Sequence, residues 1–179
     1  MEDIELNEFQ KAFREKELKA AAATGRSEAV IEDLDNIDTQ KGRYMTFMCA
    51  GDCYGIAITF VNEIIGLSQV TELPETPDYI KGLINLRGKI VPIIDVRMRF
   101  GKPEIEYNDR TCVIVINVEE DTVGLIVDAI AEVVTIDSDN ILDPPGRGGA
   151  ENRYITGIGK CAGEVKLLVD PAKLIYEQI

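Results

Sequence analysis

The strongest constraint on the fold of this chain is an internal repeat. Residues 79–95 recur without a gap at 154–170, with tyrosine first, aspartate last and two glycines at equal spacings. An earlier segment, 55–65, recurs at 124–134. A repeat of this size indicates that one supersecondary unit has been duplicated. We therefore expect two copies of one structure.

The repeat also divides the chain. Residues 1–42 differ in character from everything after them and form an N-terminal arm. Residues 43–179 form the duplicated domain, with a first copy over about 43–105 and a second over about 106–179. Duplicated units can exchange strands, so these boundaries are approximate.

Within each copy, apolar and polar residues alternate with the period of a β-strand. Residues 69–73 continue this pattern in the first copy, and 59–65 predict a helical turn that leads into a strand. Many short strands separated by turns are typical of barrels and sandwiches. We expect a mostly β fold with two five-stranded barrels side by side. Proline at position 171 predicts a short C-terminal helix.

The centre of the longer repeat predicts a hairpin with Arg87 and Gly88 in its turn, where glycine can take a positive φ. Pro92 in the return strand cannot donate a ladder hydrogen bond, which predicts an edge strand or a bulge. Ala162 replaces Arg87 in the second copy. The shared fold therefore does not require this arginine, and we expect a role for it in the first copy. A solvated turn arginine is the alternative.

In the N-terminal arm, a helix is predicted over about 4–23, because Leu6, Phe9 and Phe13 have helical spacing before a run of strong helix formers. An acidic linker follows over about 26–41, with a weak second helix as the alternative. Such a helix docks on its own domain, on a partner or on a second copy of the chain. Self-association through the arm is therefore an open expectation.

Charge and missing residue types limit the function. The net charge of −13 and the pI near 4.5 oppose binding to a nucleic-acid backbone. The chain has no histidine, which removes the commonest general base. No glycine-rich phosphate loop, membrane-length apolar run or signal peptide is present. We expect a cytoplasmic protein that is not an enzyme, uses no cofactor and does not insert into a membrane.

The four cysteines are interpreted as buried and reduced. Their spacings match no zinc pattern, and no histidine could complete a mixed site. Free cysteine behaves as a small apolar residue in cores. We therefore predict no metal site.

Recognition of another protein is the remaining hypothesis. Two segments carry a mixed apolar and charged set, consisting of Val61, Glu63, Ile64, Leu83, Ile84 and Arg87. If the fold brings Glu63 near Arg87, the two can form a bidentate carboxylate–guanidinium pair. The alternative is that the aliphatic members simply belong to the core.

Several motifs resemble the CheW family of bacterial chemotaxis coupling proteins. They include Pro77-x-x-Ile-Lys-Gly, Asn85-Leu-Arg-Gly and Ile90-Val-Pro-Ile-Ile-Asp-Val, and the similarity covers about residues 40–178. The resemblance implies two SH3-like barrels and a non-enzymatic adaptor. It also implies two partners, the cytoplasmic tip of methyl-accepting chemoreceptors and the regulatory domain of the histidine kinase CheA, in membrane-associated receptor arrays.

The resemblance further assigns receptor contact to Val61, Glu63 and Arg87, with Ile64, Leu83 and Ile84 as neighbours. Asn85, Leu86 and Gly88 form the turn motif. Kinase-binding residues cannot be assigned in this way. Two other functions stay open: a coupling module within another signalling assembly, and a small-molecule-binding β-barrel.

Overall fold

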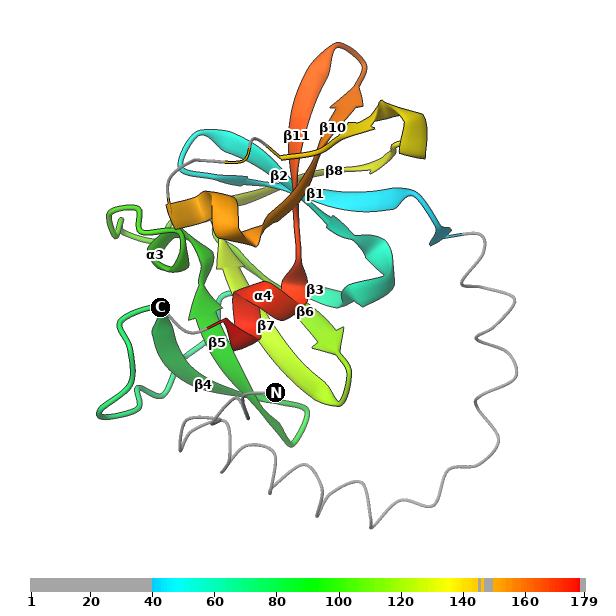
Figure 1. Cartoon of the computed structure of the whole chain (residues 1–179). Coiled ribbons are helices and arrows are strands. Elements are labelled where there is room, and N and C mark those ends of the chain that lie inside the picture. The colour runs from blue at the N-terminus through cyan, green and yellow to red at the C-terminus, as the bar shows by residue number, and fades with distance from the viewer. Residues whose placement is uncertain (1–39, 145, 147–149, 178–179) are drawn as a thin grey trace, which may run out of the picture.

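The computed structural model describes residues 40–144, 146 and 150–177 (Figure 1). The helix and most of the acidic linker predicted for the N-terminal arm lie outside these residues.

The first copy contains five strands and one short helix. These are β1 (Arg43–Cys49), β2 (Asp52–Ala57), β3 (Val61–Gly66), β4 (Ile80–Leu86), β5 (Lys89–Asp95) and α3 (Val96–Arg99). A 3-10 turn, η1 (Ile58–Phe60), precedes β3. The predicted helical turn leading into a strand is therefore confirmed.

The second copy has five equivalent strands and an equivalent final helix, together with an added two-residue strand and two 3-10 turns between β8 and β10. Its elements are β6 (Cys112–Val118), β7 (Asp121–Val127), β8 (Ala129–Thr135), η2 (Ser138–Asn140), β9 (Ile141–Leu142), η3 (Ala150–Tyr154), β10 (Ile155–Cys161), β11 (Glu164–Val169) and α4 (Pro171–Tyr176). The helix α4 confirms the predicted C-terminal helix. Pro171 occupies its first turn, and the carboxylate of Asp170 caps it by accepting from the Ala172 N–H at 2.9 Å.

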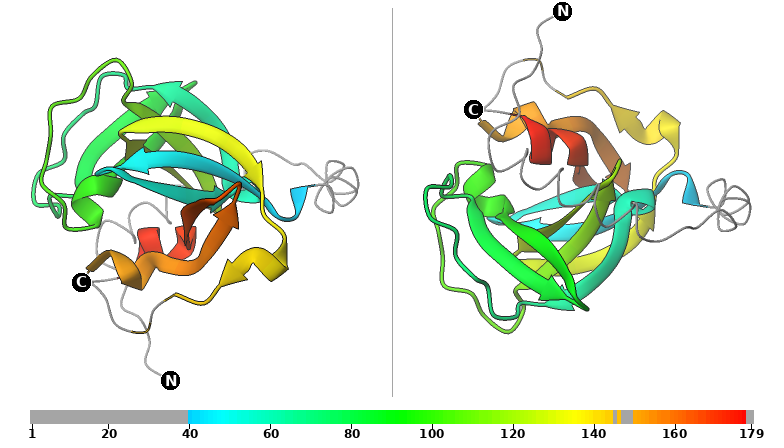
Figure 2. Two further views of the ribbon diagram at one scale, coloured as in Figure 1. Left: turned by 90° about the horizontal axis from the view of Figure 1, so that it is seen from above. Right: turned by 90° about the horizontal axis from the view of Figure 1, so that it is seen from below.

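The strands form two sheets, and the fold is mostly β as predicted. The six-stranded sheet has the order β8-β1-β2-β11-β10-β9, and the five-stranded sheet has the order β3-β6-β7-β5-β4. Each sheet contains strands from both copies, because β8 pairs with β1 and β3 pairs with β6. Figure 2 shows β8 alongside β1 in the view from above. The exchange brings first-copy and second-copy hairpins together in the five-stranded sheet.

Backbone contacts confirm the sequence register between the copies. The Asp95 N–H donates to the Tyr79 carbonyl at 2.8 Å, and the Asp170 N–H donates to the Tyr154 carbonyl at the same distance. In the first copy, as in the second, the aspartate then caps the following helix. The two aspartates therefore perform the same local task in both copies.

The larger core lies between the sheets. Its centre is a row of rings from Phe47, Tyr54, Phe100 and Tyr154, with successive centroids 5.8, 4.8 and 5.7 Å apart. A second core, called here the smaller core, is formed by side chains of the five-stranded sheet and contains Ile84 among its buried aliphatic residues. Burial of these side chains is the main stabilising contribution.

A buried arginine joins the two copies. The Arg99 guanidinium lies 4.3 Å from the ring centroid of Tyr79 and 5.1 Å from that of Tyr154, the equivalent residue. Its Nε donates to the Leu174 carbonyl at 2.9 Å, so a first-copy side chain caps the last turn of α4. Cation–π contacts of desolvated arginines stabilise such arrangements.

The predicted strand over 69–73 is wrong. Only Thr71 pairs, in a single bridge whose two hydrogen bonds with Leu83 both measure 2.8 Å. The bridge depends on Gly82, where a Cβ atom would lie 2.1 Å from the Thr71 carbonyl oxygen. Alternation in this segment reflects a loop held against the edge of β4.

The prediction that Pro92 marks an edge strand is also wrong, because β5 lies between β7 and β4. Leu83 faces Pro92 across the hairpin, and the Leu83 backbone groups bond to Thr71 instead. The Pro92 nitrogen therefore points away from β4, toward β7. Pairing with β7 begins only at Ile93, so no ladder hydrogen bond is lost at the proline.

All four cysteines are free, but only Cys49 is fully buried. The prediction of burial is wrong for Cys53, Cys112 and Cys161, which are partly exposed at strand ends. Burial, followed by the nearby Asp128 carboxylate, raises the pKa of Cys49 from 9.0 to about 12. Among the residues of known placement, no cluster could hold a metal ion and no helix has the length and apolar composition to span a membrane.

Candidate functional site

The site is built on the tight turn between β4 and β5. Arg87 and Gly88 both have positive φ, 54° and 85°, which is the backbone of a two-residue hairpin turn with the favoured twist. The side chain of Asn85 accepts from the Gly88 N–H at 2.8 Å and closes the turn. Leu86 packs against the smaller core. The motif therefore fixes the backbone from which Arg87 projects.

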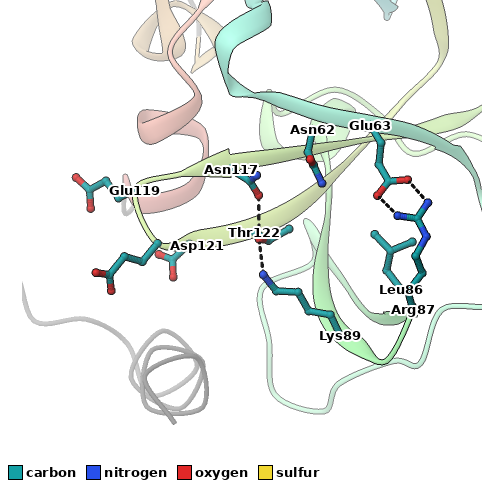
Figure 3. A pocket seen from close by; sticks show the side chains of 10 residues that line it. Asn62, Glu63, Leu86, Arg87, Lys89, Asn117, Glu119, Asp121 and Thr122 are labelled. Atoms are coloured by element: carbon teal, nitrogen blue, oxygen red, sulfur yellow. Dashed lines mark hydrogen bonds and ion pairs between the residues drawn. The ribbon is translucent and has the colours of Figure 1, made fainter. Parts of the chain in front are cut away.

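Arg87 forms a bidentate pair with Glu63 of β3. The Nη1–Oε1 distance is 3.0 Å and the Nη2–Oε2 distance is 2.8 Å (Figure 3). The Arg87 side chain is 76% exposed, whereas that of Glu63 is 20% exposed. The pair anticipated from sequence is thus formed, with the carboxylate beneath and the guanidinium presented to solvent.

The pair contributes mainly to the orientation of the guanidinium and little to stability. An exposed ion pair contributes about 0–1 kcal/mol to stability. The fork geometry holds the guanidinium plane in one direction, which a lysine could not do. In the second copy, the residue equivalent to Glu63 is Glu132, and Ala162 occupies the arginine position. The turn therefore forms with either arginine or alanine at this position.

The aliphatic residues predicted for the site do not share one surface. Ile64 is 40% exposed and Val61 and Leu83 are partly buried, but Ile84 is 3% exposed in the smaller core. Assigning Ile84 to the contact surface was wrong, because successive residues of a strand point to opposite faces. Ile90, which pairs with Asn85, is 38% exposed.

A pocket of about 410 Å³ lies beside the ion pair. Its walls come from β3, the β4–β5 turn and the β6–β7 hairpin, and its lining residues are Asn62, Glu63, Leu86, Arg87, Lys89, Asn117, Glu119, Glu120, Asp121 and Thr122. Seven of these ten residues were not predicted. The five that come from the second copy approach Arg87 because β3 pairs with β6 and β5 pairs with β7, which no local sequence signal reports.

A hydrogen-bonded chain joins two walls of the pocket. Lys89 Nζ donates to Thr122 Oγ1 at 2.8 Å, and Thr122 Oγ1 donates to Asn117 Oδ1 at 2.9 Å. Figure 3 shows Lys89 reaching from β5 toward the β6–β7 hairpin. The site therefore offers fixed charges and hydrogen-bonding groups next to a few exposed aliphatic side chains.

The two sheets define a duplicated, mostly β domain. The family model described as a CheW-like domain matches residues 43–178 of this chain. The chain belongs to the CheW family of chemotaxis adaptor proteins.

Individual relatives agree with this assignment. The chain is 38% identical over 142 residues to the chemotaxis protein CheW of Klebsiella aerogenes, covering 79% of this chain and 86% of the relative. It is 30% identical over 148 residues to CheW of Helicobacter pylori, covering 82% of each. The crystal structure of the scaffolding protein TtCheW from Thermoanaerobacter tengcongensis is similar with a TM-score of 0.71 and 34% identity, covering 74% of this chain and 91% of that one.

Proposed function

We propose that this protein couples the cytoplasmic tips of chemoreceptors to the histidine kinase CheA and thereby permits receptors to control kinase activity. Membership of the CheW family and the chemotaxis names of its relatives support this proposal. In this proposal the protein is a non-enzymatic adaptor, located in the cytoplasm and recruited to membrane-associated receptor arrays. Each sheet, with its covering segments, corresponds to one SH3-like barrel of the family.

The observation that carries the proposal is the Glu63–Arg87 pair. It is bidentate, its guanidinium is exposed, and the equivalent turn in the second copy carries alanine. A side chain that the scaffold does not need and that is nonetheless held in one orientation is suited to recognition. We assign receptor contact to this pair, with Val61, Ile64 and Leu83 as the apolar neighbours.

The direct test is autophosphorylation of CheA with a receptor signalling fragment, with and without this protein. Wild type should give receptor-dependent kinase activation, and folded Arg87→Ala should lose most of it while still binding CheA. Arg110→Ala is the matched control, because Arg110 is an exposed arginine outside the site. Equal activation by wild type and Arg87→Ala would show that the receptor contacts another part of the surface. No binding of the wild type to receptor or kinase would refute the coupling function.

A further inference from the structure

The pocket beside the ion pair is lined by a set of polar side chains that the equivalent positions in the other sheet largely lack. Its cationic side comes from the first copy, with Arg87 and Lys89, and its acidic side from the β6–β7 turn of the second copy, with Glu119 and Glu120. Figure 3 shows the turn and the Glu63–Arg87 pair on opposite sides of Lys89. The pocket is continuous with the surface to which receptor contact is assigned.

The duplication supplies an internal reference for each lining position. Only Glu63 and Asp121 keep their residue type in the other copy, as Glu132 and Asp52. The other eight positions become, in lining order, Ala131, Cys161, Ala162, Glu164, Met48, Ala50, Gly51 and Cys53. The same scaffold thus folds without this polar set. Positions 119 and 50 even share a positive φ, 54° and 52°, so the backbone of the turn does not explain the glutamate.

The lining of the pocket has a net negative charge, because its four carboxylates outnumber Arg87 and Lys89. Arg87 is paired with Glu63, and the Lys89 ammonium donates to the neutral Thr122 hydroxyl. Asp121 accepts a hydrogen bond from the Tyr176 hydroxyl, which fixes the base of the turn to α4. Glu119 and Glu120 are exposed, and neither forms an ion pair within the described part of the chain.

We propose that the acidic turn extends the receptor-contact surface into the second copy and that the pocket accepts a lysine or arginine side chain of the chemoreceptor tip. The inference rests on the proposed function and names a specificity determinant for it. A basic side chain that enters the pocket at the acidic turn would be attracted by Glu119 and Glu120. Contacts of this rim type mainly affect association rate and salt dependence.

The test is binding of a soluble receptor signalling fragment by calorimetry, with the full chain at low and at physiological ionic strength. Glu119→Lys/Glu120→Lys reverses the charge of the turn. Asp137→Lys/Asp139→Lys is the matched control and gives the same change in net charge. Both residues are exposed; Asp137 precedes η2 and Asp139 lies in it, next to β9 of the six-stranded sheet. Lysine at position 119 has no greater backbone strain than glutamate.

We expect the turn variant to lose about tenfold or more in receptor affinity at low salt, and the control to lose about twofold or less. CheA affinity should be the same for both variants, which also shows that they are folded. Equal receptor affinities for the two variants would overturn the inference. So would a loss confined to CheA binding, which would place the turn at the kinase interface. Failure of the wild type to bind any receptor fragment would overturn the proposed function and this inference with it.

Discussion

Arg87 and Ala162 occupy the same place in two copies of one hairpin turn, with φ of 54° and 49°. Because alanine already adopts this conformation in the second copy, we expect Arg87→Ala to lower the free energy of unfolding by only about 0–1 kcal/mol, the value of an exposed ion pair. Urea unfolding followed by circular dichroism measures this. A loss above about 2 kcal/mol would show that the arginine is architectural.

Exchanging the charges of the pair separates orientation from direct contact. In Glu63→Arg/Arg87→Glu the ion pair can re-form, so stability should stay within about 1 kcal/mol of wild type. Because position 87 presents the exposed partner and position 63 the more buried one, the swapped pair offers a carboxylate to the receptor. We expect receptor affinity to remain as low as in Arg87→Ala. Recovery toward the wild-type value would mean that the pair matters only for holding the two segments together.

The close approach of Thr71 to Gly82 predicts an unusually costly glycine substitution. A Cβ atom at position 82 would lie 2.1 Å from the Thr71 carbonyl oxygen, and φ is 139° there. Gly82→Ala must therefore break the Thr71–Leu83 bridge, and we expect the free energy of unfolding to fall by more than about 2 kcal/mol.

Gly88→Ala is the control for that substitution. Gly88 also has a positive φ, 85°, but a Cβ atom there meets nothing within 4 Å. It should cost about 1 kcal/mol, the price of the left-handed backbone alone. Thermal unfolding of the two variants side by side measures the difference, and equal losses would show that the bridge contributes nothing.

Sequence predicted the repeated part of this molecule well and the contacts between copies poorly. The mostly β fold, the hairpin with Arg87 in its turn and the helix that begins at Pro171 all follow from local patterns. The repeat shows which segments are equivalent, but not which neighbours they pair with. A segment such as β3 could make the same kind of ladder with its own copy or with the other. The pairing of β3 with β6 is therefore a tertiary outcome.

The same limit explains the result at the site. A Glu63–Arg87 pair was a conditional hypothesis from the residues, which the resemblance to the CheW family also suggested, and the structure joins the two side chains. Ile84 was misplaced because it points to the opposite face of β4 from its neighbour Leu83. Lys89 was missed because its partner Thr122 lies in the other copy. Differences between the copies, such as Lys89 against Glu164, were the signal available in the sequence.

The buried thiol of Cys49 makes stability depend on pH above neutrality. Burial favours its neutral form and raises its pKa from 9.0 to about 12, so between these values the folded state holds a proton that the unfolded state has lost. The folded state then binds more protons, and its stability falls as pH rises through that window. Cys49→Ala removes this dependence.

At neutral pH we expect Cys49→Ala to be less stable than wild type by about 1 kcal/mol, because a buried side chain becomes smaller. At pH 10.5 that difference should change by about 2 kcal/mol in favour of the variant, since only the wild type has the Cys49 contribution to lose. Urea unfolding at both pH values gives the comparison. Cys161→Ala is the control, because it retains Cys49 and should therefore retain the pH-dependent loss that Cys49 causes. Parallel curves for wild type and Cys49→Ala would show that the thiol ionises in the folded protein as readily as in the unfolded chain.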